Sequence, residues 1–127
     1  MGLYDMIMIK DNHIDFAGGI SSALEKAHDY CIKTNNPLKI EIEARNLGEV
    51  KEILDSCLGH RIMLDNFNYS DTRTAVKLIE NKYEIESSGG ITLETIREYA
   101  ECGVDFISVG ALTHSVKSLD LSFKAID

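Results

Sequence analysis

The sequence has little proline, little cysteine and few basic residues, and each shortage excludes a class of protein. One proline among 127 residues, with nine glycines and 44% hydrophobic residues, excludes a collagen-like or low-complexity chain. The 13 basic residues are outnumbered by 21 acidic ones, and the net charge of −8 argues against a nucleic-acid partner. The sequence contains no apolar run long enough to cross a bilayer and no secretory leader. We therefore expect a soluble, cytoplasmic protein without a membrane partner.

The cysteines predict no site. Cys31, Cys57 and Cys102 are far apart, odd in number and outside any CxxC pair. Reduced thiols explain them better than a disulfide or a metal site does.

Short apolar runs recur along the chain, separated by amphipathic stretches. The runs cover residues 6–9, 38–44, 61–64, 83–86 and 106–109. Helix patterns lie between them: a capping box at Ser22–Glu25 opens a helix to about residue 34, and Asn46 with Glu49 opens the next. Further patterns cover residues 75–79 and 93–100, and a last one is expected around residues 116–123. Strand and helix alternating in this way predict βα units and one parallel sheet with apolar strands.

Two α/β architectures fit about five such units. One is a flavodoxin-like doubly wound sheet, which suits the length of the chain. The other is part of a TIM-like β/α barrel, whose eight units need about 250 residues. Spacing alone does not choose between them.

Polar residues follow every predicted strand. In both architectures ligands bind at the carboxyl ends of the strands, so these residues are the candidate site. They are Lys10, Asp11 and His13; Glu43; Asp65 and Asn66; Ser88, Gly89 and Gly90; and Gly110 with His114.

Glu43 and Asp65 end neighbouring units, so their carboxylates are expected to face one crevice. Such a pair can hold Mg²⁺ beside a phosphate or accept hydrogen bonds from sugar hydroxyls. The alternative interpretation is a solvated rim of helix caps and turns. The glycines of the Ser88–Gly90 loop, before a helix expected from Thr92, suit an anion site, although a simple tight turn explains them equally well.

The strings MIMIKDNHI, IEIEARNL, IMLDNF, ESSGGI and GVDFISVGALTHSVKSLDLS together resemble the C-terminal part of the quinolinate phosphoribosyltransferase family. The resemblance runs along essentially the whole chain. It implies that residues 1–127 are the C-terminal portion of a β/α barrel, with an N-terminal domain and the first barrel elements absent. It also implies a transferase that converts quinolinate and phosphoribosyl pyrophosphate to nicotinate mononucleotide, pyrophosphate and CO₂, in NAD biosynthesis and with Mg²⁺.

The resemblance also assigns roles to the strand-end residues. Lys10 and His13, with Asp11 beside them, match positions that contact anionic substrate groups. Glu43 and Asp65 match the two acidic positions that hold the ribose hydroxyls and the metal. Lys10, Glu43 and Asp65 are the expected catalytic residues.

The glycine-containing strand ends match two phosphate-binding loops of that family. The first is Ser88–Gly90, and the second is Gly110 with His114. Asn66 is expected to position the residues that contact the substrate. Because the family's chain is about twice as long and supplies further cations, we expect this chain to be inactive alone and the full enzyme to be a homodimer or larger homo-oligomer.

A receiver-type signalling domain with Asp65 as phospho-acceptor is the rival interpretation. It suits the length, but a receiver needs two acidic residues after its first strand and a lysine after its fifth. Here the first strand ends in Lys10-Asp11 and the fifth in Gly110-Ala111. A non-catalytic barrel remnant that still binds phosphate is a third alternative.

Overall fold

Five consecutive strands lie side by side in the order in which they occur in the sequence. The computed structural model describes residues 6–109 and the backbone of 121–124. The strands are β1 (Met6–Ile9), β2 (Lys39–Ala44), β3 (Arg61–Asp65), β4 (Glu84–Ser88) and β5 (Phe106–Val109), all parallel, and β6 (Leu121–Lys124) pairs antiparallel with β5. The parallel order β1 to β5 confirms the predicted βα repeat.

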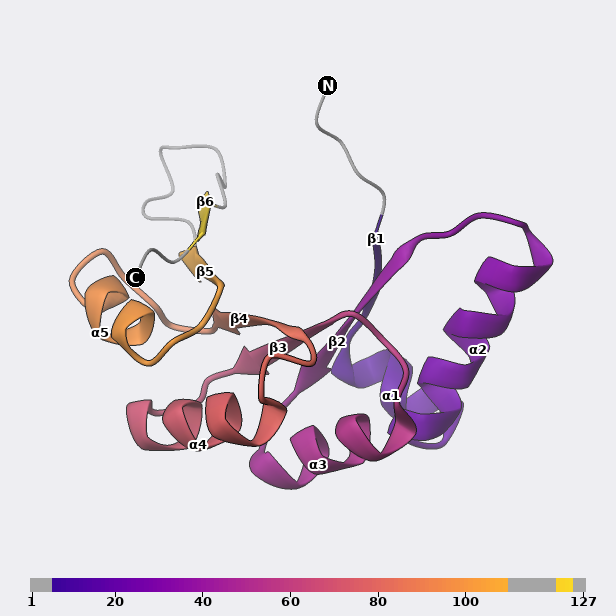
Figure 1. The fold of residues 1–127 in the computed structure, drawn as a ribbon, viewed down its shortest axis with the longest axis horizontal. Helices are drawn as coiled ribbons and strands as arrows, with labels where there is room; N and C mark the ends of the chain where they lie inside the picture. The colour runs from indigo at the N-terminus through magenta and orange to yellow at the C-terminus, as the bar shows by residue number, and fades with distance from the viewer. Residues whose placement is uncertain (1–5, 110–120, 125–127) are drawn as a thin grey trace.

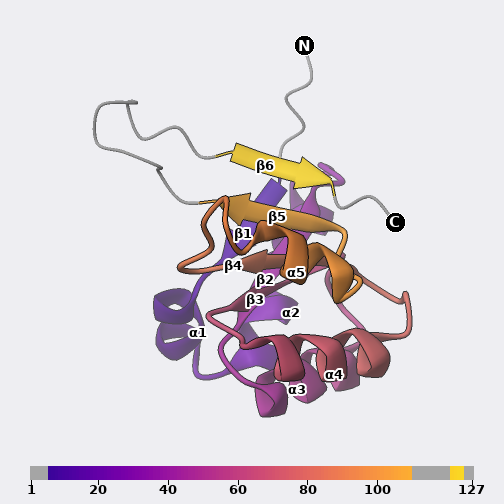
Figure 2. The same cartoon turned by 90° about the vertical axis from the view of Figure 1, so that its left-hand side faces the viewer.

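The helices lie on one side of this sheet. They are α1 (Asp11–Ala17), α2 (Ile20–Lys33), α3 (Leu47–Ser56), α4 (Tyr69–Ile79) and α5 (Ile96–Glu101). Figure 1 shows α2, α3 and α4 along the outer side of the curved sheet, and Figure 2 shows β6 beside β5. The strand order places β6 at the opposite edge of the sheet from β1. Right-handed crossovers that always step to the next strand place every helix on the same face. This order is that of a barrel segment, and it excludes the doubly wound sheet and with it the receiver domain.

The two faces of the sheet carry different residues. Ile40, Ile42, Ile62 and Leu64 are buried against the helices and form the core. The next residues along the same strands point to the inner, concave face, where several side chains are charged, because successive strand residues alternate between faces. The charged inner-face residues of β2 to β4 include Glu41, Glu43, Arg61, Asp65, Glu84 and Glu86. The expectation of apolar strands is therefore wrong for this face.

The helices differ from the predictions near both ends of the chain. The capping box at Ser22–Glu25 lies inside α2, which starts at Ile20 after Gly18 and Gly19, both with positive φ. Helix α1, which the sequence interpretation did not predict, occupies the segment before those glycines.

Near the other end of the chain, the helix expected from Thr92 begins only at Ile96. Phe123, expected to be helical, lies in β6. The rest of the helix expected around residues 116–123 lies outside the described residues. No helix in residues 6–109 is both long and apolar enough to cross a membrane.

Candidate functional site

The carboxyl ends of β1 to β4 surround one pocket of about 430 Å³. It is lined by Met8, Lys10, Asp11, Glu43, Met63, Asp65, Glu86, Ser88, Gly89, Gly90 and Ser108. Seven of these residues are among the predicted site residues. Their assembly follows from the parallel sheet, because the carboxyl ends of all its strands lie at one edge.

The link between β1 and α1 places Lys10 and Asp11 at this pocket. Lys10 is the residue before α1, in extended conformation, and its backbone N–H donates to Nδ1 of His13 at 3.3 Å. The next backbone N–H, that of Asp11, donates to Oε1 of Glu43 at 2.8 Å. His13 is therefore turned toward its own helix and, unlike Lys10, does not line the pocket.

Glu43 and Asp65 lie next to each other in the pocket wall. Burial raises the pKa of Glu43, the hydrogen bond from the Asp11 N–H opposes this, and the negative charge of Asp65 raises it further. Two neighbouring carboxylates in a partly buried pocket favour a cation or hydroxyl donors between them. The sequence predicted this arrangement, because the two residues end neighbouring βα units, and both line the same pocket.

Asn66 supports the glycine loop rather than lining the pocket. Its φ is +58°, and its backbone N–H donates to the Ser88 carbonyl at 2.9 Å. A Cβ on Gly89 would lie 2.6 Å from Oδ1 of Asn66, and Gly89 has a φ of +92°. Only glycine fits there, because both the φ angle and the close approach exclude a side chain.

The Ser88–Gly90 loop lacks the long helix expected behind it. Helix α5 has six residues and starts at Ile96, after a turn in which the Thr92 N–H donates to Oγ1 of Thr95. A helix macrodipole therefore does not reach the loop, and any anion there would be bound by backbone N–H groups and by Lys10.

The sequence interpretation missed the floor of the pocket. Glu86 is 5% exposed, and its Oε2 accepts a hydrogen bond from Oγ of Ser108 at 2.5 Å. Met8 and Met63 complete the floor. The period of two could have revealed these residues, since each lies two positions before a predicted residue or run: Met8 before Lys10, Met63 before Asp65 and Glu86 before Ser88.

A second acidic side chain is buried next to Glu86. Glu41 is 1% exposed, and its Oε2 has no hydrogen-bond partner within the described part of the chain. Burial raises the pKa of Glu41 to about 9, assisted by its hydrogen bond with Glu86. The Glu41 carboxyl group is therefore protonated at neutral pH in the folded chain.

The carboxylates of this pocket would hold Mg²⁺ only together with oxygen atoms of a bound ligand. Within residues 6–109, no three His, Cys, Asp or Glu side chains are grouped as a metal site. Mg²⁺ commonly takes one or two carboxylates together with substrate phosphates, and Glu43 with Asp65 meets that requirement. Magnesium remains a prediction.

A larger cavity, of about 540 Å³, lies at the other end of the strands. It is lined by the end of α2 and the start of β2, including Cys31, Ile32, Pro37 and Leu38. Its walls lack convergent carboxylates, so volume alone does not make it the site. The predicted residues Gly110 and His114 lie outside the described residues.

A barrel segment with carboxylates, a lysine and a glycine loop at the carboxyl ends of its strands has its polar residues where β/α-barrel proteins bind their ligands. The family profile described as "Quinolinate phosphoribosyl transferase, C-terminal domain" matches residues 1–124. The chain belongs to this family.

Curated relatives agree with this assignment. The chloroplastic nicotinate-nucleotide pyrophosphorylase [carboxylating] of Arabidopsis thaliana is 46% identical across 98% of this chain and 40% of its own length. A protein of Methanocaldococcus jannaschii, named as a probable nicotinate-nucleotide pyrophosphorylase [carboxylating], is 43% identical across 98% of this chain and 44% of its own. The chain thus spans less than half the length of these relatives.

Solved structures show the same fold. The nicotinate-nucleotide pyrophosphorylase of Francisella tularensis superposes with a TM-score of 0.77 at 40% identity, covering 94% of this chain and 41% of that one. NadC of Streptococcus pyogenes gives a TM-score of 0.76 at 35% identity, covering 94% of this chain and 41% of its own. The predicted barrel portion is confirmed.

Proposed function

We propose that this chain supplies the pentose- and pyrophosphate-binding part of a quinolinate phosphoribosyltransferase. The observation that carries the proposal is the single pocket in which Glu43, Asp65, Lys10 and the Ser88–Gly90 loop converge. In the proposed reaction the ring nitrogen of quinolinate attacks the anomeric carbon of phosphoribosyl pyrophosphate. The bond to pyrophosphate breaks and the carboxylate at carbon 2 leaves as CO₂. A proton from solvent takes its place on carbon 2, and nicotinate mononucleotide forms.

The acidic residues of the pocket act on the pentose, and Lys10 with the backbone N–H groups acts on the phosphates. Glu43 and Asp65 accept hydrogen bonds from the pentose hydroxyls and stabilise positive charge that develops at the anomeric carbon. Lys10 and the backbone N–H groups of the Ser88–Gly90 loop bind phosphate oxygens. Bound Mg²⁺, held by Glu43 and Asp65 together with the ligand, would neutralise charge on the leaving pyrophosphate.

Calorimetric titration of the chain with phosphoribosyl pyrophosphate and Mg²⁺ tests this proposal. We expect binding, and about tenfold weaker binding for Glu43→Gln and for Asp65→Asn, since each loses a hydrogen bond to a charged group. Glu52→Gln, an exposed position on α3, is the matched control and should bind as the unchanged chain does. The absence of binding to the unchanged chain would refute the proposal.

We propose that turnover needs residues beyond those described. Quinolinate carries two carboxylates and its co-substrate several phosphates, whereas Lys10 is the one cation among the described pocket-lining residues. The chain alone, mixed with both substrates and Mg²⁺, should bind ligand without forming nicotinate mononucleotide. Formation of the product would contradict this.

Assembly and location are also proposals. We propose a homo-oligomer, a homodimer or larger, for the whole enzyme, and sedimentation of the whole enzyme as a monomer would contradict it. A cytoplasmic location remains a prediction, since the Arabidopsis relative is named as chloroplastic.

A further inference from the structure

We propose that Glu86 is a third substrate-facing carboxylate of the site, which holds the pentose from the floor of the pocket. The inference rests on the proposed function, and it adds a residue that the strand-end motifs do not include. It follows from three features of the described residues: the register of the sheet, the anchoring of the Glu86 carboxylate, and the separation of charges in the pocket.

The register places Glu86 opposite Glu43. Glu43 pairs with Met63, and Met63 pairs with Glu86, so the three lie in one row across β2, β3 and β4. Adjacent strands are about 4.8 Å apart, so the two glutamates flank Met63 with backbones about 10 Å apart. Asp65 lies on the same face, two residues beyond Met63. The pocket therefore has carboxylates on three sides of the same methionine.

The Glu86 carboxylate is held in place by its neighbours. Oγ of Ser108 donates to Oε2, and Nη1 of Arg61 lies 3.6 Å from Oε1. Arg61 is fixed in turn by Glu84, at 3.1 Å from Nη2, and by the ring of Phe106, at 3.9 Å. A carboxylate fixed before the ligand arrives can stabilise charge without the cost of reorientation.

The charges of the pocket are separated between rim and floor. Lys10 and the glycines of the Ser88–Gly90 loop follow the ends of their strands, whereas Glu86 and Ser108 lie within theirs. A buried carboxylate repels phosphate and accepts hydrogen bonds from hydroxyls. The polyphosphate therefore binds at the rim, and the pentose occupies the floor beside Glu86.

Two ligands and a distant control glutamate test this assignment. Binding of phosphoribosyl pyrophosphate and of inorganic pyrophosphate, each with Mg²⁺, is measured for the unchanged chain, Glu86→Gln, Ser108→Ala and Glu52→Gln. Glu52 is the control, because it is exposed on α3 and does not line this pocket. Circular dichroism melting of each variant reports whether it folds.

We expect Glu86→Gln to bind phosphoribosyl pyrophosphate about tenfold more weakly and pyrophosphate equally or more tightly. Ser108→Ala, the milder change, should weaken the binding of phosphoribosyl pyrophosphate about threefold, and Glu52→Gln should change neither affinity. If Glu86→Gln and Ser108→Ala bind both ligands as the unchanged chain does, or weaken both ligands equally, Glu86 does not face the pentose. If the unchanged chain binds no phosphoribosyl pyrophosphate, the proposed function fails and this assignment fails with it.

Discussion

The two ends of the strands use their charged side chains differently. At the amino ends, polar groups find protein partners: Nδ1 of His60 accepts the Ile40 N–H at 2.9 Å, and Oδ2 of Asp105 accepts the Ile85 N–H at 2.9 Å. At the carboxyl ends, Glu43 lies beside a like charge, Asp65.

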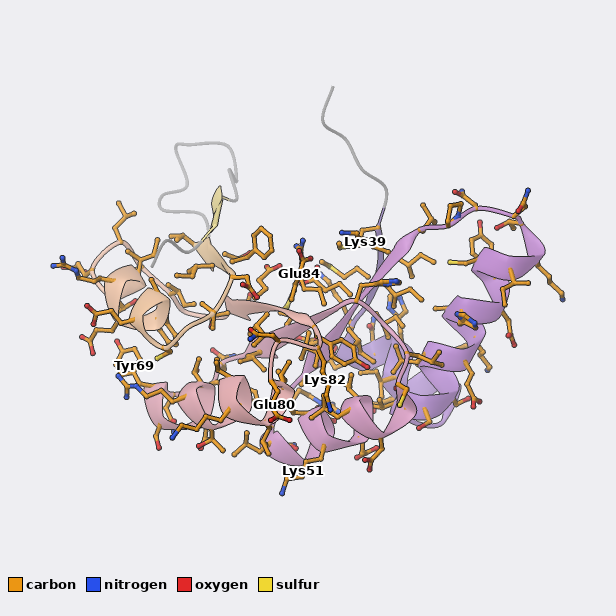
Figure 3. The ribbon with its side chains drawn as sticks, in the orientation of Figure 1. Lys39, Lys51, Tyr69, Glu80, Lys82 and Glu84 are labelled. Carbon is orange, nitrogen blue, oxygen red and sulfur yellow. The ribbon has the colours of Figure 1, made fainter. Side chains whose placement is uncertain are left out.

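At the amino ends, Arg61 and Glu84 form an ion pair at 3.1 Å and Asp105 accepts a backbone N–H, so these charges stabilise the fold. At the carboxyl ends, burial and the charge of Asp65 raise the pKa of Glu43, and the Asp11 N–H opposes this rise. A cluster of like charges of this kind is typical of a functional site. Figure 3 shows two amino-end residues, Lys39 and Glu84, on the inner side of the sheet, whereas Lys51 and Glu80 lie on the outer, helical side.

Removing the buried arginine of the amino end should have the largest effect on stability. Arg61→Ala leaves the buried Glu86 without its ion pair and removes the cation over the Phe106 ring. We expect the free energy of unfolding to fall by about 3–5 kcal/mol, as for other broken buried pairs. Urea titration measures it.

Arg97→Ala is the control, because Arg97 is exposed and its contact with Glu101 is 3.9 Å long. That change should cost less than about 0.5 kcal/mol. If Arg61→Ala and Arg97→Ala lower the free energy of unfolding equally, the cluster around Arg61 is no more structural than the solvated helix face that carries Arg97.

The pH dependence of stability should come largely from Glu41. Burial, followed by the hydrogen bond with Glu86, raises its pKa to about 9 in the folded chain. The folded state then holds a proton that the unfolded state releases, so stability falls as pH rises from about 4.5 to 9. The slope is at most about 1.4 kcal/mol per pH unit.

Urea titrations at pH 6 and pH 8 measure this slope. Glu41→Gln keeps the shape of the neutral carboxyl group and should flatten the dependence. An unchanged slope in that variant would assign the effect to another group.

The glycine loop should tolerate alanine at one position better than at the next. Gly89→Ala places a Cβ against the backbone N and side chain of Asn66, whereas a Cβ on Gly90 has only Oδ1 of Asn66 within reach, at 3.7 Å. Both residues have positive φ. We expect losses of about 2–3 kcal/mol for Gly89→Ala and about 1 kcal/mol for Gly90→Ala by thermal unfolding. The reverse order would show that the loop is not packed on Asn66.

Neutralising a carboxyl-end glutamate should have the smallest effect on stability. Glu43→Gln still accepts the Asp11 N–H through its side-chain oxygen and removes a like charge beside Asp65. Because the site is partly open to solvent, the change in unfolding free energy at pH 7 should be a gain of about 0.5 kcal/mol or less. A loss above about 1 kcal/mol would make Glu43 a structural residue.

The positions of the strands and of the rim residues could be predicted from the sequence, because the apolar runs and the polar residues after them are local signals. The strands begin and end within two residues of the predicted bounds. Helix α1 could not be predicted in this way, because it is short, Phe16 is 96% exposed and only Ile14 is buried. An amphipathic pattern therefore never develops over its seven residues.

The floor of the pocket was missed for a different reason. Glu86 lies inside a strand, so a search restricted to strand ends passes over it. Its role depends on register with β2 and on the Ser108 hydroxyl of β5, contacts that arise only when distant segments pair. That Arg61 faces the inside of the sheet could likewise not be predicted, because the inner face is defined only once the sheet curves.

Mapping of ligand contacts by NMR tests the contrast between the two ends most directly. Backbone amide shifts of the chain are followed while phosphoribosyl pyrophosphate and Mg²⁺ are added. We expect shifts concentrated at Asp11, Asp65, Gly89 and Gly90, with little change at Gly59 and Lys82 near the amino ends. Shifts concentrated at Gly59 and Lys82, or no shifts at saturating ligand, would contradict it.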